Sequence, residues 1–189
     1  HRLSSGAVRP LLIALADALA FAHENGVVHR DIKAENILLD ETGRPVISDF
    51  GIAILKTSDH SRAEITKGYG TTAYMAPEQL RGALESDGRV DLYALGVLGF
   101  RMLTGRFPVE GTDEQIAAGH MTLGEVPPVA AHAADVAPDL AAAIDRCLAR
   151  RPADRWADGA ALRDALRSRS AKPTGRFTRF IRRAVVPSR

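Results

Sequence analysis

Two short stretches decide how this chain folds and what chemistry it can carry: residues 29–39, which read HRDIKAENILL, and residues 47–51, which read ISDFG. They bring two carboxylates, Asp31 and Asp49, together with the amide Asn36 and the amine Lys33. Carboxylate and amide oxygens suit a hard ion such as Mg²⁺, which usually completes its shell with phosphate oxygens rather than with an all-protein cage. Lys33 adds a fixed positive charge. This combination predicts a phosphoryl-transfer site.

The residues just after this loop predict a small β-hairpin. Residues 37–39 (ILL) and 45–47 (PVI) are short apolar runs that flank a turn at Thr42-Gly43. Such a hairpin carries Asn36 at one end and Asp49 at the other. Two side chains that are separated in the sequence would therefore meet at one metal ion.

Upstream of the loop, leucines recur at helical spacing and predict an amphipathic helix that runs to about Glu24. Asn25-Gly26 is a natural stop, because both residues tolerate a positive φ. The start of this helix stays open between two alternatives. Pro10 is awkward if the helix begins at Ser5, and it is comfortable if it lies in the first turn.

Downstream, residues 91–103 are apolar almost all round and predict a buried central helix. The sequence TGRFP at residues 104–108 ends it. There are no internal repeats. Three shorter helices are predicted over residues 113–120, 140–148 and 160–166.

Composition indicates a single globular domain with a real core. The chain has 189 residues, of which 46% are hydrophobic and 25% charged, and a net charge of +2 is too small to argue for nucleic acid. Cys147 is the one cysteine, so an internal disulfide is excluded. No apolar run reaches the length of a membrane span, since residues 11–22 are short and interrupted by Asp17. The chain opens on His1 without a signal-peptide pattern, and we expect it to be a piece of something longer.

Five motifs follow one another in an order that resembles the protein kinases. They are HRD at residues 29–31, Asn36, DFG at residues 49–51, APE at residues 76–78, and Asp91 at the start of the apolar helix. The resemblance covers most of the chain. It implies a mainly α fold with a small β-hairpin, the C-terminal (large) lobe of the protein-kinase fold, over residues 1–170.

The resemblance also implies roles on the nucleotide side of the site. Asp31 would be the catalytic base for the substrate hydroxyl, and Lys33 would neutralise charge on the transferred phosphoryl group. Asn36 and Asp49 would hold Mg²⁺, with Mn²⁺ as an alternative ion, and ATP would be the donor. Glu35 and Leu38 match positions that border the ribose and the adenine. Plain turn or capping roles for these acids are the bland alternative.

On the substrate side, Lys33 and Thr71 are typical of kinases that modify serine and threonine, and the run YMAPEQ at residues 74–79 is similar to bacterial members of the family. Arg30 beside the catalytic acid matches kinases that are switched by phosphorylation. Thr66 is the expected phosphorylation site. Two structural roles are expected as well: a buried Glu78–Arg155 ion pair, and Asp91 holding the backbone around residues 29–30.

The sequence differs from the family pattern at two positions and lacks two of the family's motifs. Ala34 and Tyr93 stand where a proline and a tryptophan are more common, which removes no chemical group that the mechanism needs. No G-x-G-x-x-G loop and no V-A-I-K-like lysine precede the catalytic stretch. We therefore expect a missing small lobe as partner, an active full-length kinase and an inactive fragment, with proteins bearing serine or threonine as substrates. A pseudokinase-like docking module and a small-molecule phosphotransferase are the alternatives.

From residue 171 the composition shifts to a tail that is basic and lacks acids. A solvated linker is the bland interpretation of residues 171–189. A juxtamembrane segment is the sharper one, because basic residues bind anionic lipid. We expect the protein to be cytoplasmic, with this tail bringing it close to the cytoplasmic face of a membrane.

Overall fold

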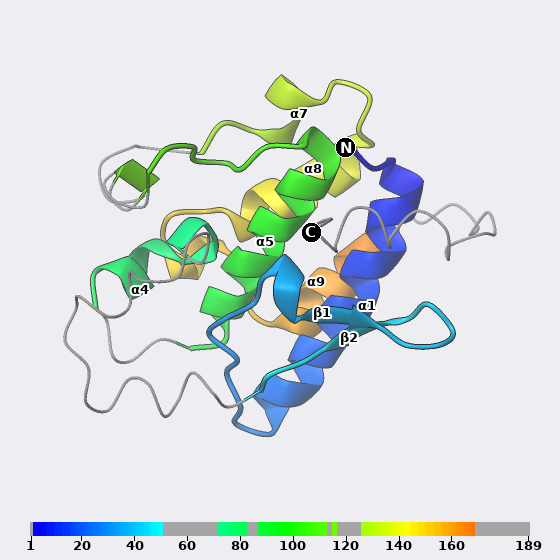
Figure 1. The fold of residues 1–189 in the computed structure, drawn as a ribbon, viewed down its shortest axis with the longest axis vertical. Coiled ribbons are helices and arrows are strands. Elements are labelled where there is room, and N and C mark those ends of the chain that lie inside the picture. The colour runs from blue at the N-terminus through cyan, green and yellow to red at the C-terminus, as the bar shows by residue number, and fades with distance from the viewer. Residues whose placement is uncertain (1, 51–71, 83–86, 113–114, 117–125, 169–189) are drawn as a thin grey trace.

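The computed structural model describes residues 2–50, 72–82, 87–112, 115–116 and 126–168, and Figure 1 shows a helical body with one small hairpin at its side. This agrees with the predicted mainly helical fold with a small hairpin. In chain order the elements are α1 (Ser5–Glu24), a 3-10 turn (Ala34–Asn36), β1 (Ile37–Leu39), β2 (Pro45–Ile47), a 3-10 turn (Thr72–Tyr74), α4 (Pro77–Leu80), α5 (Arg89–Thr104), α7 (Val129–His132), α8 (Pro138–Cys147), a 3-10 turn (Pro152–Asp154) and α9 (Gly159–Arg167).

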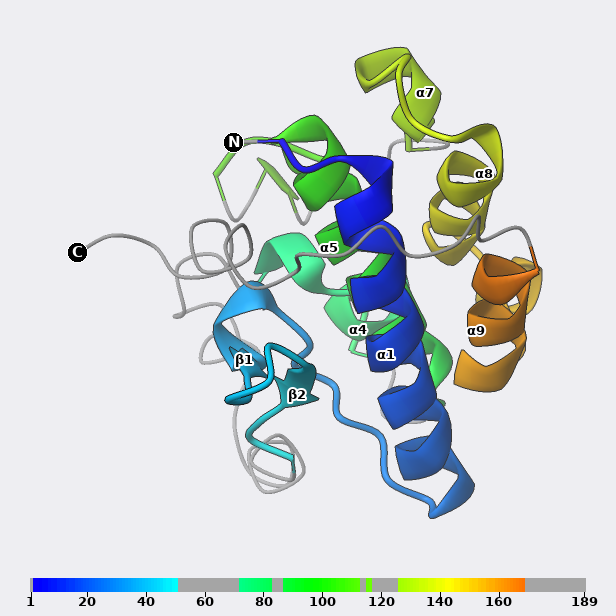
Figure 2. The same ribbon diagram turned by 90° about the vertical axis from the view of Figure 1, so that its right-hand side faces the viewer.

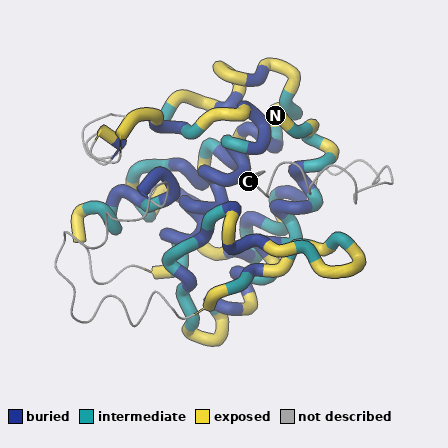
Figure 3. The backbone as a smooth tube through the Cα atoms, in the orientation of Figure 1, coloured by how far each residue is buried: buried dark blue, intermediate teal, exposed yellow. Residues whose placement is uncertain are grey.

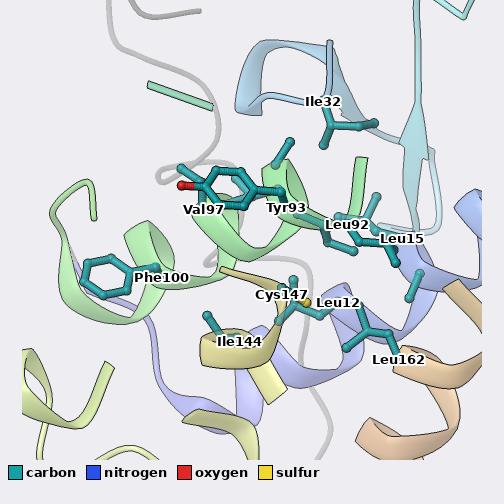
Figure 4. Packing of buried hydrophobic residues seen from close by; sticks show 14 of the residues in the cluster. Leu12, Leu15, Ile32, Leu92, Tyr93, Val97, Phe100, Ile144, Cys147 and Leu162 are labelled. Carbon is teal, nitrogen blue, oxygen red and sulfur yellow. The ribbon is translucent and has the colours of Figure 1, made fainter. Parts of the chain in front are cut away.

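Helix α5 is the centre of the body, as its all-round apolar sequence predicted. From Val90 to Thr104 every residue except Arg101 is buried. Figure 4 shows its side chains in one core with those of α1, α8 and α9, and Figure 3 shows the same helix as an almost continuous buried segment. The helix ends at Gly105, whose φ of 76° is a left-handed conformation that suits glycine.

The crossing of α5 and α8 is unusually close. A Cβ placed on Gly96 would lie 2.6 Å from the Cβ of Cys147. One helical turn along the same face, at Gly99, it would lie 3.1 Å from Ile144. Glycine at these two positions lets the α5 backbone lie directly against the side chains of Cys147 and Ile144 on α8. This close contact explains why an apolar helix has glycines in its interior.

Helix α1 begins at Ser5, so Pro10 lies inside it. Contacts with α5 explain why the earlier start is adopted despite the proline: Leu3 N–H donates to Met102 O at 2.7 Å, and Val8 is fully buried. The longer helix corrects one expectation, because by length and composition α1 could cross a membrane, the one such helix in the described ranges. Its leucines nevertheless pack into the core of this body.

The hairpin forms as predicted, with the antiparallel register Ile37↔Ile47, Leu38↔Val46 and Leu39↔Pro45. Asp40 closes the turn, because its Oδ1 accepts hydrogen bonds from Thr42 Oγ1, Thr42 N–H and Arg44 N–H. The Thr42 hydroxyl and the Arg44 amide lower the pKa of the Asp40 carboxyl. The paired Ile37 and Ile47 face the core, whereas Leu38 and Val46 are exposed.

Helix α9 packs along α1, as Figures 1 and 2 both show. Its first residue, Gly159, approaches so closely that a Cβ there would lie 2.4 Å from Ala16 O of α1. The Asp158 side chain caps α9 by accepting from Ala161 N–H at 2.7 Å. Helices α8 and α9 match the predicted helices over residues 140–148 and 160–166, while the short α4 and α7 were not predicted. Of the predicted helix over residues 113–120, only residues 115–116 are described.

Candidate active site

The backbone of the loop at residues 29–36, here called the catalytic loop after its predicted role, is held by a buried aspartate from α5. Asp91 is 1% exposed and accepts hydrogen bonds from His29 N–H at 2.8 Å and from Arg30 N–H at 2.7 Å. This confirms the expected role of Asp91. A third partner was missed by the sequence reasoning: His23 Nε2, in the last turn of α1, lies 2.8 Å from Asp91 Oδ2. The signal was available, because a buried carboxylate requires several partners.

Two residues of the site hold left-handed backbone conformations. Arg30 has a φ of 65° and Asp49 a φ of 62°. A non-glycine residue in this region costs of order 1–3 kcal/mol, and such strain concentrates at functional sites. In the described ranges these are the only non-glycine residues with positive φ. One strained residue, Arg30, directly precedes the predicted catalytic acid Asp31. The other strained residue is Asp49, the second acid of the predicted site.

The loop brings together the three side chains that the sequence placed there. Lys33 Nζ lies 2.9 Å from Asp31 Oδ2. Asn36 Nδ2 donates to the Asp31 backbone oxygen at 2.8 Å and to its Oδ2 at 3.2 Å. Because Nδ2 is turned toward Asp31, the side-chain oxygen Oδ1 of Asn36 is the atom of this amide that is left to bind a cation. The carboxylate is fixed by its own loop, while both Asp31 and Lys33 keep partial solvent access.

Asp49 reaches the same neighbourhood through the hairpin. Ser48 N–H donates to Asn36 O at 2.9 Å, and Ser48 Oγ donates to Asp49 Oδ2 at 2.9 Å. Ser48 therefore ties the end of β2 to the residue before β1. The hairpin therefore carries Asn36 before its first strand and Asp49 after its second, as predicted.

Hydrogen bonds on both ring nitrogens fix the tautomer of the His29 side chain. Its Nε2 donates to the Ser48 carbonyl at 2.8 Å, and its Nδ1 accepts from Asp31 N–H at 3.2 Å. An acceptor on one side and a donor on the other require a neutral ring with the proton on Nε2. The edge of the Phe50 ring packs against it, with ring centroids 4.7 Å apart. His29 thus joins the Asp31 backbone to the residues around Asp49.

The predicted nucleotide-border residues lie at the surface beside this loop. Glu35 is exposed in the 3-10 turn that precedes β1. Leu38 is 54% exposed, next to Val46 at 46%, and Phe50 is exposed at 42%. The hairpin therefore presents an apolar outer face near the two acids. In the described ranges no group of three or more His, Cys, Asp or Glu side chains could hold a metal ion.

The Glu78–Arg155 ion pair is confirmed and is among the most buried polar contacts of the chain. Arg155 NH1 and NH2 bind Glu78 Oε1 and Oε2 at 2.6 and 2.9 Å, and the Arg155 side chain is 0% exposed. The remaining donors bind backbone oxygens of Ala149, Arg89 and Arg150 at 2.8, 3.1 and 3.2 Å. Every N–H donor of the guanidinium is used. The ion pair thereby fixes α4 to the residues after α8 and to the start of α5.

A second anchor of this segment was not predicted. Arg101 NH1 of α5 donates to the Tyr74 hydroxyl at 2.7 Å, and its guanidinium lies 4.4 Å from the centre of the Phe107 ring. Burial raises the pKa of Tyr74, although the charge of Arg101 opposes that shift. Tyr74 thereby joins the residues before α4 to α5.

Thr66, the expected phosphorylation site, lies outside the described residues, and so do Thr71 and Gly51 of the DFG motif. Arg30, the predicted phosphate receiver, is described. Its Nε is buried and has no hydrogen-bond partner among the described residues. A buried guanidinium nitrogen without a partner is costly, so this atom is a candidate for an anionic ligand.

Comparison with known proteins adds family evidence to this geometry. A family model described as protein kinase domain matches residues 1–167. The chain is 43% identical to the serine/threonine-protein kinase Pkn1 of Myxococcus xanthus, over 87% of this chain and 24% of that protein. It is 36% identical to the serine/threonine-protein kinase PknB of Mycobacterium tuberculosis (strain ATCC 25618 / H37Rv), over 82% and 25%. The chain spans about a quarter of the length of the curated relatives it matches.

Proposed function

This chain belongs to the protein kinase domain family, and from that premise we propose that residues 1–170 are the large, C-terminal lobe of a serine/threonine protein kinase. The reaction is transfer of the ATP γ-phosphate to serine or threonine hydroxyls of protein substrates. One observation carries the proposal: the Asp31 carboxylate is held by both Lys33 and Asn36, with Asp49 tied to the same loop through Ser48. A scaffold without chemistry has no need of all four groups.

In this proposal Asp31 orients the substrate hydroxyl and accepts its proton. Lys33 and Asn36 both bind Oδ2, so among the described residues Oδ1 is the oxygen left to face the hydroxyl. General base catalysis contributes about 10²–10⁴-fold. The larger share must come from positioning and charge neutralisation, which explains why so much of the loop is fixed by buried partners.

Lys33 would neutralise charge that builds on the transferred phosphoryl group, because its ammonium lies beside the base. Asn36 Oδ1 and the Asp49 carboxylate would hold Mg²⁺, or Mn²⁺ in its place, with ATP phosphates completing the shell. When bound, the ion would offset the negative charge of the phosphate groups. Glu35 would border the ribose and Leu38 the adenine.

The other wall of the nucleotide cleft would come from a small lobe elsewhere in the full-length protein. The 189 residues contain no G-x-G-x-x-G loop. The exposed apolar face of Leu38, Val46 and Phe50 beside the site supports this, because water-exposed apolar side chains grouped at one place favour a covering partner. This chain alone is then expected to fold but not to phosphorylate.

Activation would follow phosphorylation of Thr66, with Arg30 as the receiver of the phosphate. Thr71 and Glu78 would belong to the same activation and substrate-binding part of the chain. The buried Arg30 Nε, which has no hydrogen-bond partner among the described residues, supports this role, because a phosphate would supply an acceptor. Mass spectrometry of the active full-length protein is expected to find phosphate on Thr66, and an unmodified loop in fully active enzyme would contradict the proposal.

A cytoplasmic location and a membrane-proximal role for residues 171–189 remain part of the proposal. These residues lie outside the described ranges, so their sequence is the support. Binding to vesicles should require anionic lipid if the tail acts by charge. Equal binding to neutral and anionic vesicles would rule that out.

The catalytic assignment is tested in the full-length protein with Asp31→Asn and Asp49→Ala. Each should abolish phosphate transfer from ATP to a peptide while leaving the thermal unfolding midpoint near that of the wild type, because both side chains are at the surface of the site. Asp17→Asn, an exposed acid on α1, is the matched control and should keep full activity. Near-normal turnover in either well-folded site variant would favour a docking module instead.

A further inference from the structure

Gln79 of α4 connects two segments that the mechanism uses separately. Its Oε1 accepts from Ala76 N–H at 2.9 Å, and its Nε2 donates to Arg30 O at 3.2 Å. The two partners fix the orientation of the amide, since Ala76 N–H can only donate and the Arg30 carbonyl can only accept. One side chain therefore spans from residues 72–80, here called the docking segment, to the catalytic loop.

The Arg30 carbonyl belongs to the peptide unit that leads directly into Asp31. The N–H of that unit donates to His29 Nδ1 at 3.2 Å, and the Arg30 N–H before it donates to Asp91 Oδ1. Arg30 itself holds the strained φ of 65°. Gln79 thus holds the carbonyl side of a peptide whose orientation sets where the Asp31 side chain points.

We propose that Gln79 is a positioning residue that couples the docking segment to the catalytic base. When the docking segment is in place, the Gln79 amide holds the Arg30 carbonyl and keeps the Asp31 carboxylate aligned. When the segment shifts, that hydrogen bond is lost and the strained Arg30 peptide can rotate. The inference rests on the proposed kinase function, because it assigns a role around the same base.

The two bonds of Gln79 can be separated by substitution. Glu at position 79 keeps the oxygen that accepts from Ala76 N–H but replaces the donor to Arg30 O with an anionic oxygen. Lys at position 79 keeps a donor and loses the acceptor. Gln115 provides a matched control, because its Oε1 accepts from Thr112 N–H at 2.9 Å in the same local capping arrangement.

The first test measures kcat and the KM for ATP in the full-length protein. Gln79→Glu is expected to lower kcat about five- to tenfold, the loss of one hydrogen bond, with the KM for ATP and the unfolding midpoint little changed. Gln79→Lys should retain more kcat than Gln79→Glu. Gln115→Glu should behave as the wild type. A wild-type kcat in Gln79→Glu, or a loss of kcat that follows unfolding in every variant, would overturn the proposal.

The second test does not depend on activity. Hydrogen–deuterium exchange of the peptide covering residues 29–33, measured on this chain, should be about fivefold faster in Gln79→Glu than in wild type or Gln115→Glu. Unchanged exchange there would reject the contact as a positioning device. If the wild-type protein shows no phosphate transfer, the proposed function fails while the exchange rates still decide whether Gln79 holds the loop.

Discussion

Replacing Arg155 with methionine is the perturbation for which the structure gives the largest calculable effect. Methionine has a similar length and no charge, so the change removes the hydrogen bonds without leaving a large cavity. It removes the donor that Arg155 provides to each of three carbonyls, those of Ala149, Arg89 and Arg150, and the counter-charge that Arg155 provides to the Glu78 carboxylate. Each carbonyl costs about 1 kcal/mol, and breaking a buried ion pair from one side costs about 3–5 kcal/mol in total.

A double-mutant cycle separates the ion pair from the carbonyls. Glu78→Leu alone should also cost about 3–5 kcal/mol, because it leaves a guanidinium that is 0% exposed without its counter-ion. The double variant should cost only about 3 kcal/mol, since no buried charge remains and the three carbonyls account for the loss. It should therefore be more stable than either single variant, although it carries two changes.

The assay is urea unfolding of this chain followed by far-ultraviolet circular dichroism. Arg151→Met is the matched control: this nearby arginine is 79% exposed and pairs with Asp154 in solvent, so its loss should leave the free energy of unfolding close to that of the wild type. Costs that add up in the double variant would refute the reasoning, as would an Arg155→Met variant within 1 kcal/mol of wild type. Either result would mean that water or rearranged side chains provide hydrogen bonds to the groups that lost their Arg155 or Glu78 partner.

Three further effects follow from other parts of the body. Burial acts to raise the pKa of Asp139, but the hydrogen bond and charge of Arg9 outweigh burial and lower that pKa. The stabilisation from this carboxylate is complete above its ordinary pKa of 3.8 and is lost as the pH falls through the lower pKa of the folded state. Asp139→Asn should therefore flatten the acid side of the curve of unfolding free energy against pH, and an unchanged acid side would count against this reasoning. Burial raises the pKa of the Cys147 thiol to about 12, so iodoacetamide at pH 8 should label it only in denaturant. Gly96→Val should lower the free energy of unfolding by about 1–3 kcal/mol or more through its clash with α8, whereas Gly6→Ala, where a Cβ meets only Ser4 Oγ at 3.9 Å, should cost nothing; equal stabilities would contradict the close crossing.

Features that depend on local sequence were predictable. The Thr42-Gly43 turn between two apolar runs predicted the hairpin, because turn chemistry and β-branched residues act within a few positions. The almost entirely apolar sequence of residues 91–103 predicted a buried central helix for the same reason. The short helices α4 and α7 carried no such signal, since their four residues cannot display a helical period.

Features that depend on tertiary contacts were harder to predict. Pro10 argued against an early start of α1, yet packing of Val8 and Leu3 against α5 outweighs the hydrogen bond that a proline cannot make. Two contacts that were missed join residues far apart in the sequence: His23 on α1 contacts Asp91, 68 positions later, and Gln79 on α4 contacts Arg30, 49 positions earlier. Nothing in their local patterns points to the loop, so only the need of a buried polar group for partners could have suggested them.

The chemistry of the site depends on this long-range architecture. Arg30 and Asp49 each hold a backbone conformation that costs of order 1–3 kcal/mol, and a short loop cannot retain it without support. Asp91 supplies that support from the most buried helix of the body, and Ser48 supplies it from the hairpin. The strain is therefore sustained by the stability of the core. It follows that a change which loosens α5 by a few kcal/mol should release the catalytic loop before it unfolds the chain.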